Sequence, residues 1–565
     1  MMRDLNDKKL FLFFLCIWLI LNVLQAAFTQ LDPDEAYYWM YSKELDWGYF
    51  DHPPAIAILI KLGYALIKNE LGVRLGIILL QIGSFYGIWL ILGKPQEKSK
   101  IWTLITLLVA MPMLQVYGFI ATPDSPLLFF AAWFFYFYQK FVTKETWFNT
   151  LFLGACMAAL LYSKYHGILL IFFTLLSNWR LLLKPQFYIA SIFGAMLFFP
   201  HLYWQYSQDF PSFRYHLVGR DDPYELKHTA NYILNQFLIF NPLLFPFILI
   251  SLFRQVNKDA LYRAFLFIIF GFWFFFLYTT SKGHVEPQWT VLLSIPFVIL
   301  TWKYAVRDNN FIFAQWLKRL ALLSFGLLLI ARIALIKGNI FNWKSNFHRS
   351  VWVSELQEKA KGLPIIFQNS YRDPSLYTFY TGELAYSFTD ANYRKNQFDI
   401  WDWEKALHNQ RVAMAGQPLW NCRYCQNLKL TRKIFKLKFI DSLQITQKIN
   451  FDFKIPSEHT INKSVSLSIE IENPYYHTIQ MNAGNMPLQI VAIFYDFEKE
   501  KIKNITKVNF KTPVNQLLPQ KTLAAKVNFS IPNMPAGEYV FALGIQTGDL
   551  PPSFNSKLIK IKVTQ

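Results

Sequence analysis

Acidic and aromatic side chains crowd the stretch from Leu31 to Pro54, which directly follows an apolar run at 10–28. The acidic residues are Asp32, Asp34, Glu35, Glu44, Asp46 and Asp51, against the single lysine Lys43. The aromatic residues between them are Tyr37, Tyr38, Trp39, Tyr41, Trp47, Tyr49 and Phe50. Trp and Tyr settle at membrane–water boundaries, where a carboxylate beside apolar walls can act as a general base. We therefore expect a proton-accepting site at a membrane surface, centred on Asp34 and Glu35.

The same carboxylates also fit a purely structural interpretation. Asp32 stands before Pro33 and a helical run, which is the usual pattern of a helix N-cap. Asp34 and Glu35 then fall in the first turn, where the helix dipole favours a carboxylate whatever its function. Both interpretations stay open for this stretch.

Three further short segments carry polar residues between apolar runs. Asp124 stands in ATPDSP (121–126), where the flanking prolines predict a rigid turn rather than a helix end. Lys164 and His166 lie in LYSKYHG (161–167). SKGHVEPQW (281–289) contains Lys282, His284 and Glu286. His284 and Glu286 either offer a divalent metal two ligands or belong to a hydrogen-bonded loop, and two ligands alone are weak evidence for a metal.

Composition points to a protein that crosses a membrane many times. Of 565 residues, 53% are hydrophobic and only 16% are charged, well below the usual charge of soluble domains. Apolar runs of spanning length predict about eleven helices, near 10–28, 71–93, 101–119, 126–142, 147–163, 166–182, 187–206, 232–253, 261–280, 288–303 and 317–337. The shorter apolar run 55–67 after Pro53-Pro54 predicts a helix lying at the interface.

The basic residues between these runs predict the orientation. With the N-terminus inside, every inner loop is basic and the acidic loop 29–53 is outside, as is everything after Lys337. The formal charge of +19 therefore does not indicate a nucleic-acid partner, because much of it lies in these short inner loops. We expect an uncleaved first helix, since no small-residue cleavage site follows Phe28.

Cations on the outer face have no orientational reason to be there, so they need partners. Lys164 and Lys282 are expected to bind either a lipid phosphate or an acidic loop residue. Arg214 and Arg220 lie in the outer loop 207–231, which is either an anion-binding lid or a solvated loop.

The outer C-terminal part divides into two predicted domains. Residues 1–339 form the membrane domain, with 29–70 as its first outer loop; 340–445 mix helix and strand patterns. There, 362–368 predict a strand and 375–382 a helix ending at Gly382. Residues 446–565 alternate apolar and polar side chains, which predicts a β-sandwich of the immunoglobulin type. Cys422 and Cys425 predict a local disulfide rather than a zinc site.

In order and sidedness, the motifs DPDEAYYW, FDHPPA, ATPDSPL, SKYHG and HVEPQW resemble those of the GT-C membrane glycosyltransferases. Within that fold they are similar to the bacterial dolichyl-phosphate-mannose-protein mannosyltransferase-like group (glycosyltransferase family 39/83), which includes aminoarabinose transferases acting on lipid A. The resemblance covers roughly residues 10–340 and leaves the C-terminal sandwich unassigned.

The resemblance implies a reaction at the outer face of a bacterial cytoplasmic membrane. A polyprenyl-phosphate sugar, undecaprenyl-phosphate-like, would donate its sugar with inversion to a lipid, glycan or protein acceptor. Asp34 would be the base, Asp124 would support the acceptor or the developing positive charge, and Lys164 would neutralise the leaving phosphate. The expected phosphate-binding and donor-binding residues also include His166, Lys282, Arg214 and Arg220. The expected substrate pocket comprises Tyr37, Trp39, Trp47, Tyr49, His52, His284 and Glu286, with Glu35 beside the base.

No cofactor follows from the resemblance, since relatives differ in their use of a divalent metal. Two other function classes remain. A transporter or flippase for a lipid-linked sugar would place charges along a path through the bilayer, whereas here polar residues gather at one face. A membrane-anchored binding protein would need far fewer spans. Loss of transfer in an Asp34→Asn variant would distinguish the enzyme from both.

Overall fold

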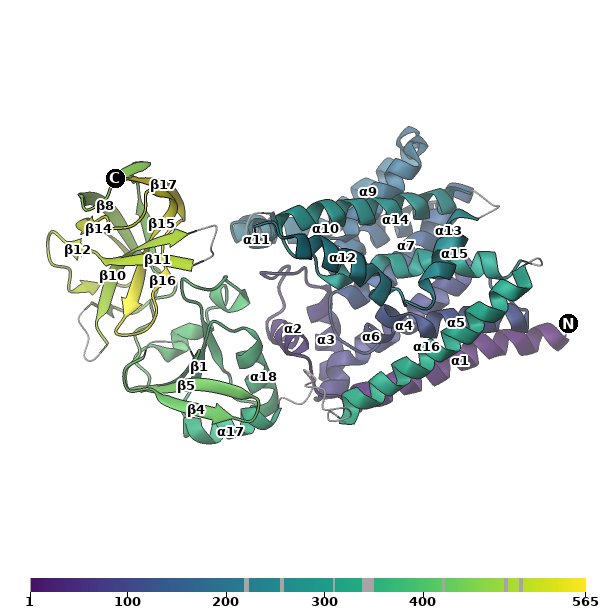
Figure 1. The fold of residues 1–565 in the computed structure, drawn as a ribbon, viewed down its shortest axis with the longest axis horizontal. Coiled ribbons are helices and arrows are strands. Elements are labelled where there is room, and N and C mark those ends of the chain that lie inside the picture. The colour runs from purple at the N-terminus through teal and green to yellow at the C-terminus, as the bar shows by residue number, and fades with distance from the viewer. Residues whose placement is uncertain are drawn as a thin grey trace. The chain divides into compact units, whose positions relative to one another are not determined.

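The structure is a computed structural model that describes residues 2–217, 223–254, 259–307, 310–337, 350–418, 422–481, 486–496 and 501–565. The chain forms two compact units, Met1–His348 and Arg349–Gln565 (Figure 1). The first unit is helical and the second is rich in strands. The domain boundaries expected at 339 and 445 stay predictions.

The first unit consists of α-helices with short 3-10 turns. Its helices are α1 (Met2–Phe28), α2 (Pro33–Lys43), α3 (Ala55–Leu66), α4 (Glu70–Ile91), α5 (Lys98–Ala110), α6 (Pro112–Val116), α7 (Asp124–Thr143), α8 (Trp147–Ser163), α9 (Gly167–Ser177), α10 (Pro185–Ser207), α11 (Pro211–Leu217), α12 (Leu226–Ile239), α13 (Phe245–Phe253), α14 (Ala260–Thr279), α15 (Ser294–Ala305) and α16 (Phe311–Lys337). The 3-10 turns are η1 (Trp179–Leu183), η2 (Thr280–Lys282) and η3 (Pro287–Leu293).

Among the described residues, five helices are long and apolar enough to cross a membrane: Lys9–Phe28, Glu70–Ile91, Pro185–Ser207, Ala260–Lys282 and Phe311–Lys337. Other expected spans are interrupted. The run 101–119 changes from α5 to α6 at Met111, because Pro112 cannot continue the backbone ladder. The run 232–253 divides into α12 and α13 around Asn241, whose φ is +72°. The number of about eleven spans stays a prediction.

Four helix pairs of the first unit form a connected series of contacts. α3 packs on α4, α4 on α7, α7 on α8, and α8 on α10. At the last contact, a Cβ placed on Gly154 would lie 2.3 Å from the carbonyl oxygen of Ala190. A Cβ on Gly194 would lie 2.8 Å from the carbonyl oxygen of Gly154. Small residues thus let α8 and α10 approach, as in many membrane helix pairs.

The second unit begins with a five-stranded sheet in the order β2-β1-β3-β5-β4. The strands are β1 (Ile365–Gln368), β2 (Tyr386–Phe388), β3 (Val412–Gly416), β4 (Gln426–Leu430) and β5 (Lys433–Ile440). The helices are α17 (Ser350–Ala360) and α18 (Arg372–Thr381), with short turns η6 (Gln397–Asp399) and η7 (Trp403–Leu407). The expected strand at 362–368 and the helix ending at Gly382, whose φ is +78°, are confirmed.

The rest of the second unit is β-structure. Its strands are β6 (Asn450–Phe453), β7 (Glu458–Thr460), β8 (Ser464–Asn473), β9 (Ile479–Gln480), β10 (Leu488–Asp496), β11 (Lys501–Lys507), β12 (Asn509–Phe510), β13 (Gln516–Leu517), β14 (Lys521–Ser530), β15 (Gly537–Thr547), β16 (Ser553–Phe554) and β17 (Ile559–Thr564). One sheet has the order β12-β14-β8-β6 and another β11-β10-β15-β17-β7. Phe529 of β14 stacks on Phe541 of β15 with ring centroids 5.5 Å apart, so side chains of both sheets share a core.

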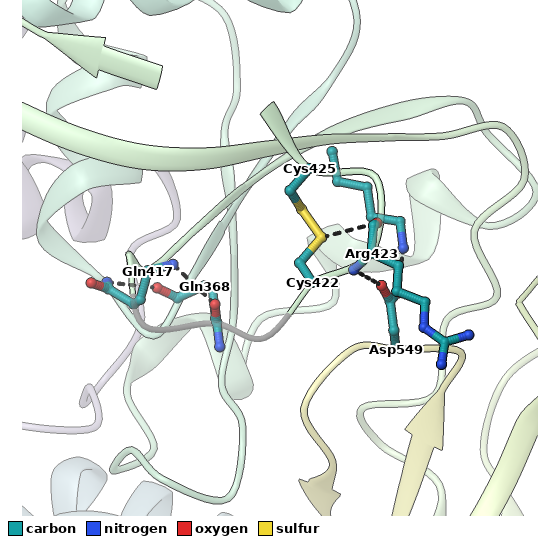
Figure 2. The surroundings of a disulfide bond; sticks show 7 residues. Gln368, Gln417, Cys422, Arg423, Cys425 and Asp549 are labelled. Carbon is teal, nitrogen blue, oxygen red and sulfur yellow. Dashed lines mark hydrogen bonds and ion pairs between the residues drawn. A yellow bond between two sulfur atoms is a disulfide. The ribbon is translucent and has the colours of Figure 1, made fainter. Parts of the chain in front are cut away.

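Cys422 and Cys425 form a disulfide just before β4, as expected (Figure 2). The loop is held by the Arg423 N–H, which donates to Asp549 Oδ2 at 2.8 Å. Lys438 of β5 forms an ion pair with the other oxygen of the same carboxylate. The disulfide therefore closes a loop that β5 and the turn after β15 already fix.

We expect Gly154→Val to destabilise the first unit by about 1–3 kcal/mol, because the added side chain meets rigid backbone rather than a movable side chain. The thermal unfolding midpoint of the detergent-purified protein measures this. Gly326→Val is the matched control, since no atom lies within 4 Å of a Cβ at that helical position. Equal midpoints for the two variants would show that α8 and α10 do not pack this closely.

Candidate active site

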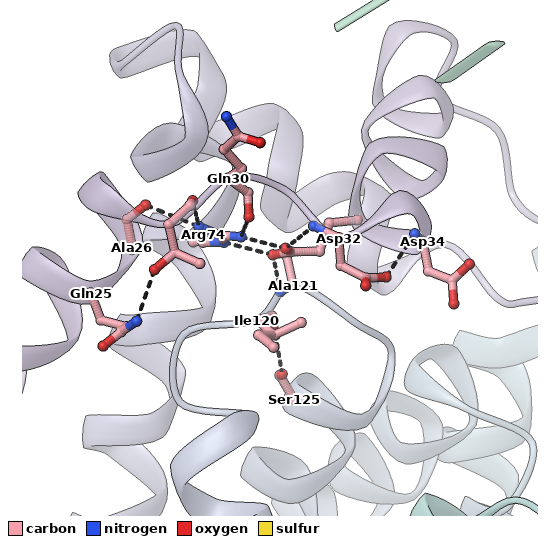
Figure 3. Close-up of polar contacts among 11 residues, drawn as sticks. Gln25, Ala26, Gln30, Asp32, Asp34, Arg74, Ile120, Ala121 and Ser125 are labelled. Atoms are coloured by element: carbon pink, nitrogen blue, oxygen red, sulfur yellow. Dashed lines mark hydrogen bonds and ion pairs between the residues drawn. The ribbon is translucent and has the colours of Figure 1, made fainter. Parts of the chain in front are cut away.

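Helix α2 presents the acidic pair of the first loop. Asp32 caps the helix: its Oδ1 accepts the Asp34 N–H at 2.9 Å. Glu35 completes a capping box, because its Oε2 accepts the Asp32 N–H at 2.9 Å. The N-cap interpretation of Asp32 is thus confirmed, and Asp34 and Glu35 lie in the first turn. Figure 3 shows the Asp34 carboxylate directed away from Arg74.

Glu35 is the centre of a buried ion pair that joins three segments. Its side chain and that of Arg74 on α4 are fully buried, and Arg74 donates to Oε1 at 2.7 Å and to Oε2 at 2.5 Å. Arg74 also donates to the carbonyl oxygens of Ala26 and Thr29 at the end of α1, and to that of Gln30 just beyond it. Four N–H groups therefore face the Glu35 carboxylate, two from Arg74 and one each from Asp32 and Ala121. Each of the two Glu35 carboxylate oxygens therefore accepts two hydrogen bonds.

The Ala121 contact ties the first loop to the segment that carries Asp124. The Ala121 N–H donates to Glu35 Oε1 at 2.7 Å (Figure 3). Ser125 Oγ donates to the Ile120 carbonyl at 3.0 Å and fixes the turn between them. The expectation that Asp124 stands in a turn rather than at a helix end is wrong: Asp124 is the first residue of α7. Its prolines allow this, because proline is tolerated in the first turn of a helix, where N–H groups have no helical partner.

Lys164 and Asp124 form a second buried pair. Lys164 Nζ lies 2.8 Å from Asp124 Oδ1 and 2.9 Å from Oδ2, with both side chains under a tenth exposed. Lys164 is the C-cap of α8, so the pair joins the ends of α7 and α8. Of the two partners expected for Lys164, the structure places the acidic loop residue against it.

The HVEPQW loop reaches the same neighbourhood. The ring of His166 lies 5.3 Å from that of Trp289. The buried phenol of Tyr117, at the end of α6, interacts electrostatically with Asp124, Glu286 and Asp32. Asp32 before α2, Asp124 at the start of α7 and Glu286 before η3 are therefore near enough to Tyr117 to act on it electrostatically.

The expected metal ligands His284 and Glu286 lie near each other but have no third ligand beside them among the described residues. His284 Nε2 lies 3.9 Å from Glu286 Oε2. Within the described ranges, no three His, Cys, Asp or Glu side chains are grouped as a metal site would require.

The aromatic residues of the first loop differ in exposure. Tyr37 and Tyr49 are fully buried, and Tyr41 stacks on Tyr49 with centroids 4.1 Å apart. Burial raises the pKa of Tyr49, so its phenol stays a donor to the carbonyls of Tyr41 and Glu44. Trp39 is also buried and packs on Tyr64. Trp47 is 55% exposed, whereas Tyr37 and Tyr49 support the loop from within.

The remaining predicted residues are dispersed. His52 packs edge-on against Tyr38 at 5.5 Å. Arg214 on α11 pairs with Asp209 at the surface, and Lys282 is exposed at the end of η2. Arg220 lies outside the described residues.

Sequence reasoning missed Arg74 and Tyr117. Arg74 is a charged residue inside the apolar run 71–93, and a charge in such a run is a signal of a buried pair or a functional site. Tyr117 gives no comparable signal, because tyrosines are frequent in this chain and the break after α6 is not evident from spacing.

We expect Glu35→Gln to destabilise the first unit by about 3–5 kcal/mol, the usual cost of leaving a buried charge without its partner. Glutamine keeps the shape but turns an NH₂ group toward N–H donors that the carboxylate accepts. Thermal unfolding in detergent provides the measurement. The exposed Glu44→Gln, in the same loop, is the control. A Glu35→Gln protein as stable as this control would remove the junction from its structural role.

Known proteins share both local sequence and fold with this chain. Residues 51–204 match the family model described as dolichyl-phosphate-mannose-protein mannosyltransferase. No curated protein matches the chain in sequence. The crystal structure of ArnT from Cupriavidus metallidurans in the apo state is similar with a TM-score of 0.58 and 12% identity, covering 75% of this chain and 97% of that one.

A second structure of the same protein, bound to undecaprenyl phosphate, is similar with a TM-score of 0.57 and 14% identity over the same shares. Identities this low show the fold alone. The family match covers α3 to most of α10, and therefore includes Arg74, Asp124 and Lys164. The chain has the GT-C glycosyltransferase fold and is similar to the dolichyl-phosphate-mannose-protein mannosyltransferases and to ArnT.

Proposed function

We propose that this protein is a membrane glycosyltransferase that transfers a sugar from a polyprenyl-phosphate donor, undecaprenyl-phosphate-like, to an acceptor lipid, glycan or protein. The family match, the fold and the undecaprenyl phosphate bound to the similar ArnT support this proposal. We place the reaction at the outer face of a bacterial cytoplasmic membrane.

The observation that carries the proposal is the bond from Ala121 N–H to Glu35 Oε1. Asp34 directly precedes Glu35 in the sequence. Asp124 comes soon after Ala121, as the first residue of α7. This one contact therefore brings the proposed base into the neighbourhood of the Asp124–Lys164 pair. A base and a cation so arranged suit a reaction in which a proton leaves one reactant and an anion leaves the other.

The step balances as an inverting displacement. An acceptor oxygen attacks the anomeric carbon as the bond from that carbon to the phosphate oxygen breaks. Asp34 takes the acceptor proton, and polyprenyl phosphate departs with the electron pair of the broken bond. Preorganised charges near the departing oxygen contribute more than they would in water, because they need no reorganisation.

Lys164 is suited to receive the phosphate. An ammonium carries three N–H groups, and two directions meet the oxygens of Asp124. Within the part of the chain that the structure describes, Lys164 Nζ has no hydrogen-bond acceptor other than Asp124. We therefore assign its third N–H to a phosphate oxygen, while Asp124 keeps the ammonium oriented. Asp124 thereby acts through Lys164 in addition to any contact with the acceptor or the sugar.

Glu35 takes a different part in this proposal from Asp34. Its carboxylate is fully buried and faces four donors, so it holds the two loops in place instead of exchanging protons. Among the aromatic residues, Trp47 is the exposed candidate for stacking on sugar, with His52, His284 and Glu286 completing the pocket. His166, Lys282, Arg214 and Arg220 are proposed to assist phosphate or donor binding, and a divalent metal at His284 and Glu286 is a further proposal.

The proposal includes about eleven spans with the second unit outside the cytoplasm, and an immunoglobulin-type sandwich within that unit. The stacking of Phe529 on Phe541 between two sheets supports the sandwich. The disulfide Cys422–Cys425 supports an oxidising compartment outside the cytoplasm.

Asp34→Asn is expected to abolish sugar transfer, by at least about 100-fold for the loss of a general base, while leaving undecaprenyl phosphate binding within about twofold. Transfer is measured by mass spectrometry of envelope lipids, glycans and proteins from cells that lack the gene and carry each variant. Binding of undecaprenyl phosphate is measured on the purified protein.

Glu44→Gln, an exposed carboxylate in the same loop, serves as the control and is expected to transfer normally. Normal transfer by the Asp34→Asn variant would remove Asp34 from its role. Movement of a lipid-linked sugar across vesicles with no transfer product would instead favour a flippase.

A further inference from the structure

Arg332 on α16 is a charged side chain buried among apolar helices. It is 4% exposed and donates three hydrogen bonds. Nε donates to Gln25 Oε1 at 3.2 Å, Nη1 to Gln115 Oε1 at 2.8 Å and Nη2 to Asn22 Oδ1 at 2.6 Å. Its guanidinium also lies 5.4 Å from the ring of Trp18 and 4.8 Å from that of Phe119. Residues of α1, α6 and the turn after α6 thus converge on this one side chain.

The partners of Arg332 are neutral. None of the carboxylates that the structure describes forms an ion pair with it, and its hydrogen-bond acceptors are side-chain amides. A buried cation without a counter-charge is costly, so the presence of Arg332 points to a role that the planar fork of an arginine serves and a hydrophobic residue does not. Charged residues within membrane helices are functional candidates for the same reason.

One chain of contacts leads from Arg332 to the first loop. Gln25 receives the Arg332 bond and donates to Thr29 Oγ1 at 2.8 Å. The carbonyl of Thr29 accepts from Arg74, and Arg74 holds Glu35 next to Asp34. Figure 3 shows the part of this chain that runs from Gln25 past Arg74 to Asp32 and Asp34.

A second chain leads to the segment before Asp124. Gln115, on α6, accepts from Arg332 and donates to the carbonyl of Val109. The side-chain oxygen of Gln81, on α4, accepts hydrogen bonds from Asn22 and Trp18, and its side-chain nitrogen donates one to the Leu114 carbonyl. A Cβ on Gly118 would lie 2.2 Å from Gln81 Oε1, so the turn after α6 is packed directly on this network. Phe119 lies beneath Arg332, two residues before Ala121.

We infer that Arg332 is a positioning residue that sets the loops of Asp34 and Asp124 in their relative places, acting through Gln25–Thr29–Arg74 and through Gln115. This inference rests on the proposed function for its catalytic consequence, but its structural consequence stands on the contacts alone. Through the same hydrogen bonds, Arg332 also joins α16 to α1 and α6.

Arg332→Gln tests the inference in two independent ways. Amide hydrogen exchange at 118–123 and 29–35 of the full-length protein in detergent should rise about tenfold, as for the loss of a hydrogen bond to a charged group. The rate of sugar transfer per protein molecule should fall about tenfold or more through misplaced reactants, while the Kd for undecaprenyl phosphate changes less than about twofold. Such a split between rate and binding is not expected of general unfolding.

Arg319→Gln is the matched control, because Arg319 is an exposed arginine of the same helix that lies over Trp316. Thr29→Val is the milder second variant, since it removes only the hydroxyl that accepts from Gln25. If the first chain carries the effect, the double variant Arg332→Gln/Thr29→Val should lose less than the sum of the single losses.

The outcomes separate the inference from the proposed function. Unchanged exchange at both segments in Arg332→Gln, or strictly additive losses in the double variant with Thr29→Val, would overturn the inference. Absence of any transfer by the unaltered protein would overturn the proposed function, yet exchange would still test the positioning. Should Arg332→Gln fail to fold, exchange in Thr29→Val alone decides: unchanged exchange at 29–35 contradicts the inference.

Discussion

The buried pair of Glu35 and Arg74 is the interaction on which the rest of the site depends. A carboxylate and a guanidinium that are removed from water are stable only if their donors and acceptors are hydrogen-bonded. Here the carbonyl oxygens of Ala26, Thr29 and Gln30 accept the hydrogen bonds of Arg74 that Glu35 does not. The end of α1, the start of α2, α4 and the Ala121 turn are thus fixed by one junction. No hydrophobic contact specifies direction in this way, because burial of apolar surface is roughly non-directional. The polar junction therefore supplies the geometry, and the surrounding apolar core supplies the stability.

Around that junction, neighbouring charged side chains differ in their surroundings. Glu35 faces Arg74 and two backbone N–H groups, and Asp124 faces Lys164, while Asp34 projects on the side of α2 away from Arg74. Adjacent acidic residues in the DPDEAYYW motif thus differ in environment through helical geometry alone, because successive positions point about 100° apart around a helix. This difference in surroundings is the reason that the proposed function assigns the two neighbouring carboxylates different roles.

Local sequence patterns predict several elements of the fold correctly, but they predict fewer of the contacts that build the candidate site. The apolar runs predict about eleven spans, and five of these runs coincide with helices of the described residues that are long and apolar enough to cross a membrane. Local spacing also predicts the N-cap at Asp32, the helix end at Gly382 and the Cys422–Cys425 disulfide, and the structure confirms all three. Asp124 was misread, because prolines on both sides suit a turn and a helix start equally well. Arg74, Tyr117 and Arg332 were missed, because their partners lie tens to hundreds of residues away and depend on how α4, α6 and α16 pack. Local signals predict elements, whereas such long-range polar contacts arise only from tertiary packing.

A cryo-electron microscopy structure of the protein with undecaprenyl phosphate bound tests the central claim most directly: Asp34 and the Asp124–Lys164 pair serve one site. The account predicts a phosphate oxygen about 3 Å from Lys164 Nζ, with Glu35 still bonded to Ala121 and the Asp34 carboxylate facing the same space. A phosphate bound away from Lys164, with Asp34 opening to a different cavity, would contradict it.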